Sequence, residues 1–248
     1  MLSNKFKINY SIGSVANGVK TDTFTFFLLF FYSNIIGLNP GLAGSAIFIA
    51  LCIDAITDPL MGTISDRTNS SLGRRHPYMF MSFIPMSLGY IFLFAPRQGW
   101  DMSQTDLFLW MTVFTVLTRL GMTLFDIPHR AFGGEVTKDY QERTILMSWR
   151  EAFGWIAGLS NAFLGYGIFF ASTPEYPQGQ LNPDAWFPFA LTGAIVMIIS
   201  VLYSSYSTKD EIKSLSKWTG NITLTDIFKE LRIATVSYTH LTLPTSIQ

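Results

Sequence analysis

The chain has 248 residues, of which 49% are hydrophobic and only 14% are charged, whereas soluble domains carry about 25% charged residues. So few charges cannot cover a soluble protein, and the composition therefore predicts an all-α integral membrane protein. Seventeen Lys and Arg residues balance seventeen Asp and Glu residues, so no net charge favours nucleic acid as a partner. The single Cys52 excludes an internal disulfide framework and a cysteine-based metal site.

Six stretches are long and apolar enough to cross a bilayer, which takes about 20 residues per helix. These expected spans are approximately 11–36, 42–64, 77–96, 104–132, 146–171 and 185–206. Lys and Arg residues gather in the loops of one side, and only Arg97 falls on the other. The positive-inside rule then predicts a multi-pass inner-membrane protein whose amino terminus lies in the cytoplasm. The first stretch lacks a small-residue cleavage site, so it is expected to be a retained span.

The sequence divides into three parts. Residues 1–206 form the six-helix transmembrane unit. Residues 207–235 are polar and of mixed charge, with apolar residues at roughly helical spacing, which predicts a cytoplasmic linker with a short amphipathic helix. Residues 236–248 share no feature with the preceding chain and resemble a translated sequencing adapter, so we interpret them as an artefactual tail.

Two carboxylates lie within the second expected span. Asp54 and Asp58 are four residues apart, hence on one helix face, and Asp54 is close to the middle of the span. Two carboxylates one turn apart in a low dielectric require a cation or a proton between them. With the hydroxyl of Thr57, they predict a site for a monovalent cation. The alternative is that Asp58 caps a kink at Pro59 and that Asp54 pairs with an arginine.

The fourth expected span holds a second polar stripe. Arg119, Thr123, Asp126 and Arg130 follow at offsets that place all four on one helix face. Such a stripe must face the bundle interior or a water-filled cavity, because lipid would leave the charges unpaired. Pro128 is expected to break the helix beside Asp126. The alternative is a structural ladder of ion pairs between Asp126 and either Arg119 or Arg130.

Other candidates lie on the first and fifth spans. Asp22 either lines the cavity of the bundle or forms an ion pair with a cation on a neighbouring helix. Arg150 is either a gating ion-pair partner or an arginine at the cytoplasmic interface. The phenylalanines of segment 24–31 are expected to face lipid, with sugar stacking as the alternative. A ridge of small residues at four-residue spacing predicts close helix packing, and it comprises Gly154, Gly158 and Ala162.

Two groups of motifs resemble one transporter family. The first is DAITDPLMGTISDR at 54–67, followed by GRRHP at 73–77. The second is DIP at 126–128 with EVT at 135–137 and WR at 149–150. Their order and spacing resemble the glycoside-pentoside-hexuronide:cation symporters, the melibiose-carrier family of the major facilitator superfamily. The resemblance covers about residues 10–206.

This resemblance implies a twelve-helix carrier in two pseudo-symmetric halves, of which the chain supplies the amino-terminal six helices. It implies that the coupling cation, Na⁺, Li⁺ or H⁺, is held by Asp54, Thr57, Asp58 and Thr123. It further implies a gating loop whose ion pairs break on opening, with the residues Asp66, Arg67, Arg74 and Arg75.

The resemblance also implies a sugar-binding role for Asp126 and for Arg150, to which we add Asp22 and Arg130 as candidates. The first-helix sugar carboxylate of the melibiose carrier aligns near Gly18 rather than Asp22. Arg130 replaces an aromatic residue that packs on the sugar. An added arginine would suit a hexuronide or another anionic substrate, because its guanidinium can bind a carboxylate with two hydrogen bonds.

The sequence therefore predicts a cation-coupled symporter of a glycoside, pentoside or hexuronide, without catalytic residues or cofactor. Its expected partners are the lipid bilayer, a small sugar and a missing carboxyl-terminal six-helix half. One alternative is an inactive half-carrier that needs a second half or homodimerisation. A remote alternative is an intramembrane aspartyl hydrolase that uses Asp54 or Asp126, although neither lies in a Tyr-Asp or Gly-x-Gly-Asp setting.

Overall fold

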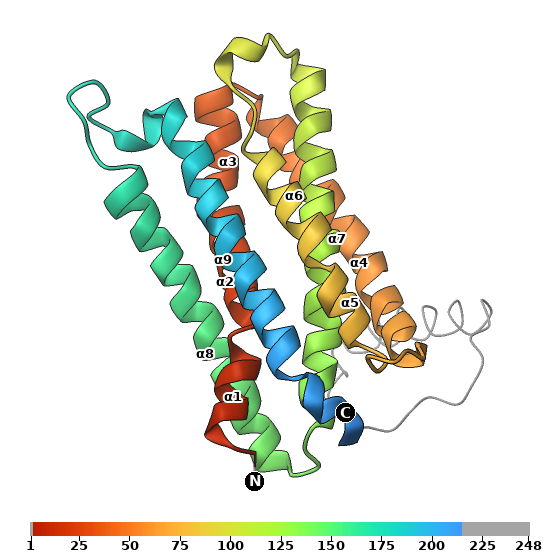
Figure 1. Ribbon diagram of the computed structural model, residues 1–248. Coiled ribbons are helices and arrows are strands. Elements are labelled where there is room, and N and C mark those ends of the chain that lie inside the picture. The colour runs from red at the N-terminus through yellow and green to blue at the C-terminus, as the bar shows by residue number, and fades with distance from the viewer. Residues whose placement is uncertain (1, 215–248) are drawn as a thin grey trace, which may run out of the picture.

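Residues 2–214, the part of the chain that the computed structural model describes, form helices that run up and down the molecule (Figure 1). No β-strand occurs within these residues. The expected amphipathic helix after Ser214 and the tail 236–248 lie outside the described residues.

The first expected span is a run of short helical pieces: α1 (Asn4–Ser11), α2 (Ser14–Asp22), η1 (Thr23–Phe27), α3 (Leu28–Phe30) and η2 (Phe31–Ile36). Two of these pieces, η1 and η2, are π-helical. The run ends at Gly37, whose backbone has a φ of 85°, in the left-handed region that favours glycine.

The remaining chain forms longer helices joined by short connections. They are α4 (Pro40–Arg67), α5 (His76–Met81), α6 (Phe83–Leu93), η3 (Gln98–Trp100), α7 (Gln104–Glu135), α8 (Tyr140–Leu164), η4 (Gly165–Phe169), η5 (Gly179–Leu181), η6 (Pro183–Ala185), α9 (Trp186–Ser207) and η7 (Lys209–Ser214).

Within the described residues, four helical segments are long and apolar enough to cross a membrane: Pro40–Arg67, Gln104–Glu135, Tyr140–Phe169 and Pro183–Glu211. They match four of the six expected spans. The other two expected spans, 11–36 and 77–96, coincide with the interrupted runs from α1 to η2 and from α5 to α6.

Polar caps explain where three of the long helices begin. The side chain of Asn39 accepts a hydrogen bond from the backbone of Gly41 at the start of α4, and Ser103 and Asp106 form a capping box on α7. Asp139 accepts from the backbone of Glu142, so α8 begins at Tyr140 rather than at 146. Each cap satisfies a backbone N–H group that the first helical turn leaves without a partner.

The expected break beside Asp126 is wrong. The helix α7 continues through Pro128, and α4 likewise continues through Pro59. A proline inside a helix removes one backbone hydrogen bond and can kink the helix, but the turns on both sides keep their own bonds. Asp126 therefore projects from a continuous helix.

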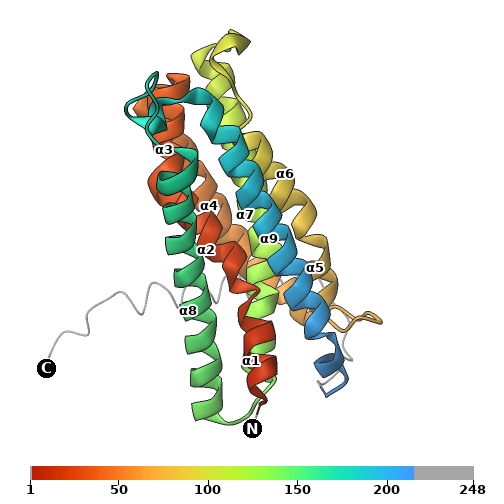
Figure 2. The same ribbon diagram turned by 60° about the vertical axis from the view of Figure 1, so that its left-hand side comes forward.

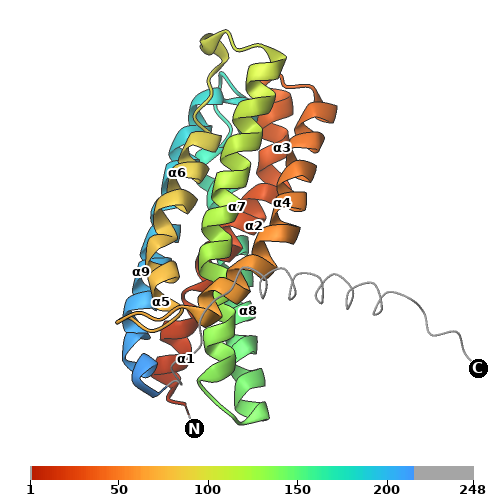
Figure 3. The ribbon, with the colours of Figure 1, turned by 90° about the vertical axis from the view of Figure 1, so that its right-hand side faces the viewer.

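The helix α7 packs along both α4 and α6, and α2 packs along α8 (Figures 2 and 3). The contact between α2 and α8 is very close at Gly18, where an added Cβ would lie 2.1 Å from the carbonyl oxygen of Gly154. Gly154 belongs to the predicted ridge of small residues, so its expected role in close packing is confirmed at this position.

Aromatic rings fill the core beside α3, the helix that lies at the end of the bundle opposite α1 (Figure 1). Phe27 and Phe31 are buried and pack against the indole of Trp186, with ring centroids 6.2 and 5.1 Å away. The expectation that this phenylalanine segment faces lipid is wrong for these two residues. Phe26 lies on the other side of the helix and is 60% exposed.

Positive charges gather at one end of the bundle, the lower end in Figure 1, where α1 begins and α9 ends. The short connections 68–75 and 136–139 also lie at this end. The described cations here include Lys5, Lys7, Arg67, Arg74, Arg75, Lys138 and Arg143. The asymmetry expected from the sequence is therefore present in the fold.

Candidate functional site

Two carboxylates on α4 have different surroundings. Arg119 of α7 donates to Asp54 Oδ2 from both Nε and Nη2, each at 2.5 Å. The arginine pair that the sequence left open for Asp54 is thus present. The other oxygen, Oδ1, is buried and has no hydrogen-bond partner among residues 2–214, and the same holds for the hydroxyl of Thr57.

Asp58, one turn further along α4, has a neutral partner. Thr123 of α7 donates its hydroxyl hydrogen to Asp58 Oδ1 over 2.7 Å. No cation pairs with Asp58 among residues 2–214, and the helix passes through Pro59 without ending. Four candidate residues of the cation site therefore meet across one helix contact: Asp54, Thr57, Asp58 and Thr123.

These four residues offer carboxylate and hydroxyl oxygens, the ligands that hard cations prefer. Within the described part of the chain, no group of three or more His, Cys, Asp and Glu side chains could hold a metal ion. The oxygen set at α4 and α7 differs from such a group because two of its four members are threonines.

Lys20 on α2 is a charged residue of this region that the sequence did not assign to the site. Its ammonium group forms no hydrogen bond or ion pair with a side chain of residues 2–214. It interacts electrostatically with four side chains of the neighbouring helices: Asp54, Asp58, Arg119 and Asp126. The polar regions of α2, α4 and α7 are therefore coupled by charge.

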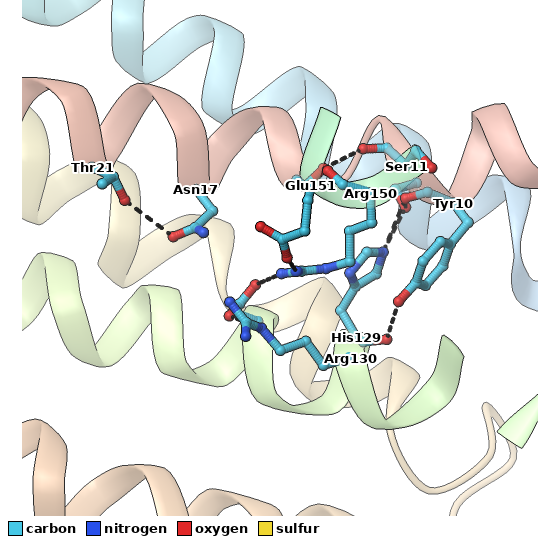
Figure 4. Close-up of polar contacts among 11 residues, drawn as sticks. Tyr10, Ser11, Asn17, Thr21, His129, Arg130, Arg150 and Glu151 are labelled. Atoms are coloured by element: carbon cyan, nitrogen blue, oxygen red, sulfur yellow. Dashed lines mark hydrogen bonds and ion pairs between the residues drawn. The ribbon is translucent and has the colours of Figure 1, made fainter. Parts of the chain in front are cut away.

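A second network surrounds Asp126 on α7. Arg150 of α8 donates to Asp126 Oδ1 from one amino group and to Glu151 over 2.5 Å from the other. Arg130, one turn along α7, donates to Asp126 Oδ2 over 2.7 Å. Figure 4 shows the side chain of Arg150 between those of Glu151 and Arg130.

The burial of these cations separates their roles. The side chain of Arg150 is 1% exposed and that of Arg130 is 51% exposed. Arg150 is therefore an internal ion-pair residue and not an arginine exposed at the cytoplasmic interface. Of the two ladders left open for Asp126, the one with Arg130 is present, whereas Arg119 pairs with Asp54.

Asp22 lies at the carboxyl end of α2 and is buried, with 8% of its surface exposed. Asn161 of α8 donates to its Oδ2 over 2.7 Å, and the same amide group donates to Thr23 over 3.1 Å. No cation pairs with Asp22 within residues 2–214. Asp22 lines a cavity between α2 and α8, and its place in a substrate cavity stays a prediction.

The predicted gating loop is tied to the end of α7. Arg75 pairs with Asp66 at 2.5 Å and with Glu135 at 2.7 Å, and Arg74 pairs with Glu135 at 2.5 Å. The loop between α4 and α5 is thus joined by charge to the carboxyl end of α7. Glu135 was noted in the sequence only as part of a motif, and its spacing gives no signal of these partners.

His129 is a buried polar residue that sequence reasoning missed. Its ring stacks on that of Tyr10 with centroids 4.2 Å apart, and its Nε2 lies 3.1 Å from the carbonyl oxygen of Tyr10. Asn161 was missed as well. Both are single polar residues among apolar neighbours, and only the partner on another helix reveals what they contact.

Long apolar helices that bury ion pairs and unpaired oxygens in their middle define a multi-pass membrane transport protein. The chain belongs to the MFS/sugar transport protein family, whose sequence profile it matches over residues 9–233.

Several curated relatives are named as symporters. The chain is 33% identical over 198 residues to the uncharacterized symporter sll1374 of Synechocystis sp., which covers 79% of this chain and 35% of that protein. It is 33% identical over 149 residues to the putative glycoside/cation symporter YagG of Escherichia coli, covering 60% and 32%. It is 21% identical over 211 residues to the isoprimeverose transporter of Lactiplantibacillus pentosus, covering 84% and 42%.

These matches confirm the resemblance to the glycoside-pentoside-hexuronide:cation symporters. The chain is a transporter-family member and not an enzyme, so the aspartyl-hydrolase alternative is excluded. The chain spans about a third to a half of the length of the curated relatives it matches.

Proposed function

We propose that the chain is the amino-terminal, six-helix half of a twelve-helix, cation-coupled sugar symporter of the inner membrane. In this proposal the interrupted segments 11–36 and 77–96 cross the membrane beside the four long helices. The amino terminus lies in the cytoplasm, because the end of the bundle that holds it also holds most of the cations. The names of the relatives support glycosides as the class of substrate.

The observation that carries the proposal is the oxygen cluster between α4 and α7. Within residues 2–214, Asp58 has a hydroxyl partner and no cation in hydrogen-bond contact, although Lys20 and Arg119 interact with it electrostatically. Buried oxygens of Asp54 and Thr57 have no hydrogen-bond partner in this part of the chain. Buried polar atoms without partners are costly, and a carboxylate inside a membrane requires a neutralising charge. A monovalent cation, Na⁺, Li⁺ or H⁺, would satisfy both requirements at this position.

The proposed sugar-binding residues are Asp22, Asp126, Arg130 and Arg150. Arg150 is buried against Asp126 and fixes the orientation of that carboxylate, while Arg130 remains half exposed. An exposed guanidinium beside the site would bind the carboxylate of a hexuronide with two hydrogen bonds.

Coupling follows from the adjacency of the two sites. The cation changes the charge near Asp126, so it changes the affinity for sugar, and by linkage the sugar changes the affinity for the cation equally. The two halves would rock about the central site and expose it to each side in turn. The ion pairs among Asp66, Arg75 and Glu135 would hold the cytoplasmic side until they break.

A second proposal concerns the chain by itself. Half of a carrier would wall only one side of the central cavity, so the chain alone would be inactive unless a second half or a second copy completes it. Uptake by membranes that contain only this chain, together with a dimeric mass in detergent, would favour homodimerisation of halves.

The experiment that tests the symporter is sugar uptake by the complete carrier in proteoliposomes, with and without an inward Na⁺ gradient. Asp58→Asn keeps the shape of the side chain and removes its charge, so it should abolish stimulation by the cation. Asp101→Asn, in an exposed connection at the other end of the bundle, is the matched control and should keep it. Full stimulation in Asp58→Asn would remove Asp58 from the cation site.

A further inference from the structure

Two cavities lie on opposite sides of the contact between α2 and α8, and their linings differ in chemistry. The first, of about 350 Å³, is lined mainly by apolar side chains such as Val15, Val19, Phe153 and Ile156. The second, also of about 350 Å³, has a mixed lining, in which the polar side chains of Asn17, Thr21, Asp22 and Glu151 stand among apolar and glycine positions. In a membrane-spanning bundle, polar side chains face the interior or a water-filled path, so the second cavity is the one that faces the substrate.

This polar cavity also holds two exposed aromatic rings. Trp155 of α8 is 73% exposed and Phe26 of η1 is 60% exposed, and both line the cavity. Their neighbours Phe27 and Phe153 point away from it. The π-helical turn η1 begins directly after Asp22 and carries Phe26, and π-helical turns occur frequently at functional sites.

The polar groups of the cavity are held in place by the surrounding helices. Asn161 holds Asp22 through its Oδ2, and no hydrogen bond to Asp22 Oδ1 occurs among residues 2–214. Glu151 pairs with Arg150, which in turn pairs with Asp126. Figure 4 shows Asn17 and Thr21 on α2 at the side of this network. Asp22 therefore lines the cavity itself, and Glu151 connects it through ion pairs to Arg150 and Asp126.

A cavity with rings on its wall and carboxylates at its base matches the two surfaces of a sugar. One face of a pyranose presents C–H groups that pack on an aromatic ring, and its edge presents hydroxyl groups that donate to carboxylates. Small-molecule sites occupy about 300–1,000 Å³ and combine aromatic walls with a few placed polar groups. The cavity of about 350 Å³ fits one or two sugar rings better than a larger ligand.

We propose that Trp155, with Phe26 on the facing helix, forms the aromatic platform for the sugar ring, and that Asp22 Oδ1 accepts a hydroxyl hydrogen of the same ring. This inference rests on the proposed function. It assigns the aromatic ring that stacks on the sugar to α8, and the sequence motifs did not connect the aromatic residues of this helix with substrate. It also explains how the chain binds a sugar although Arg130 replaces the aromatic residue expected on α7.

The test measures binding rather than transport, with the complete carrier in detergent and a panel of radiolabelled methyl glycosides: methyl β-xyloside, methyl α-galactoside and methyl β-glucuronide. Trp155→Ala should weaken binding of the preferred glycoside about tenfold, and Trp155→Tyr should restore it to within about threefold of the parent. The matched control is Phe153→Ala, which removes a ring from the apolar cavity on the opposite side of α8 and should leave the affinity unchanged.

A second measurement does not depend on the alanine variant folding. Binding of the glycoside should change the tryptophan emission of the parent, and Trp155→Phe should lose that change. The proposed aromatic platform would be wrong if Trp155→Ala bound the glycoside with the affinity of the parent. It would also be wrong if the emission change persisted in Trp155→Phe. If the parent bound no glycoside, both the platform and the proposed function would fall. If it bound glycosides identically with and without Na⁺, only the cation coupling would fail.

Discussion

Thr123 on α7 donates its hydroxyl hydrogen to Asp58 on α4 over 2.7 Å, whereas Asp54, one turn earlier on the same face, pairs with Arg119 at 2.5 Å. One carboxylate of the face is neutralised by the protein and the other is not. Within residues 2–214 no cation forms an ion pair with Asp58, and Lys20 and Arg119 interact with it only electrostatically. This asymmetry makes Asp58 the carboxylate of choice for the proposed mobile cation.

Thr123→Val should weaken the apparent affinity for the coupling cation about tenfold or more, because it removes one oxygen ligand and the hydrogen bond that orients Asp58. Valine has the shape of threonine, so the packing between α4 and α7 is kept. The measurement is the Na⁺ dependence of sugar uptake by the complete carrier. Sugar binding without cation should stay close to that of the parent.

The control for this change is Thr115→Val on the same helix. The hydroxyl of Thr115 is also buried but has no hydrogen-bond partner in the described part of the chain, so its loss should not affect the cation dependence. An unchanged Na⁺ dependence in Thr123→Val would place the cation elsewhere.

The sequence predicted which residues share a face, but not which partners they have. The spacing of Arg119, Thr123, Asp126 and Arg130 places them on one side of α7, and the structure agrees. Pairing depends on the rotation and height of α4 and α8 against α7, which no single helix encodes. From the sequence, Arg119 could therefore pair with either Asp54 or Asp126. The packing of α4 against α7 brings it to Asp54.

The sequence likewise predicted only some of the features of the helices. Apolar length located the four long helices, because burial in a bilayer requires about 20 apolar residues. It did not predict the π-helical turns of the first run or the uninterrupted passage of α7 through Pro128. Both depend on whether neighbouring helices satisfy or shield a few backbone groups, and single-residue preferences do not report this.

Asp126→Asn should destabilise the protein by about 1–3 kcal/mol, because it removes one of the two carboxylates that pair with the buried Arg150 and leaves Glu151 as the other. Arg150→Met should cost a similar amount, because Asp126 then keeps only Arg130 as its partner. The double variant should lose less than the sum of the two single changes, since the interaction between Asp126 and Arg150 is lost only once. Thermal unfolding in detergent measures all three, and strictly additive losses would show that the two residues do not interact.

Gly18→Ala should lower the unfolding temperature, because the new Cβ would lie 2.1 Å from the carbonyl oxygen of Gly154 and the helices α2 and α8 must separate. Overpacking of this kind costs about 1–3 kcal/mol. Gly44→Ala on α4 is the matched control, since its Cβ meets no atom within 4 Å, and alanine is favoured over glycine in a helix by roughly 0.5–1 kcal/mol. The two variants should therefore shift the unfolding temperature in opposite directions.

His76, which precedes the expected span 77–96, should make stability depend on pH. It is buried edge-on against Phe132 at 4.9 Å, and its Nε2 lies 3.1 Å from the hydroxyl of Thr208. Burial lowers the pKa of His76 from 6.5 to about 4, so the folded protein keeps the ring neutral while the unfolded chain takes up a proton. Stability is therefore full above the unfolded pKa of 6.5 and falls as the pH drops from there towards about 4.

Between about pH 7 and about pH 5.5 the loss from this one group should be about 1.2 kcal/mol, since the unfolded chain binds the proton there and the folded protein hardly does. His76→Gln retains a hydrogen-bonding side chain that does not titrate, so its unfolding temperature should fall less between neutral pH and about pH 5.5. The difference between parent and variant isolates His76 from the carboxylates, which titrate lower. If the unfolding temperatures of parent and variant fell equally with pH, the ring of His76 would be protonated as easily in the folded protein as in the unfolded chain.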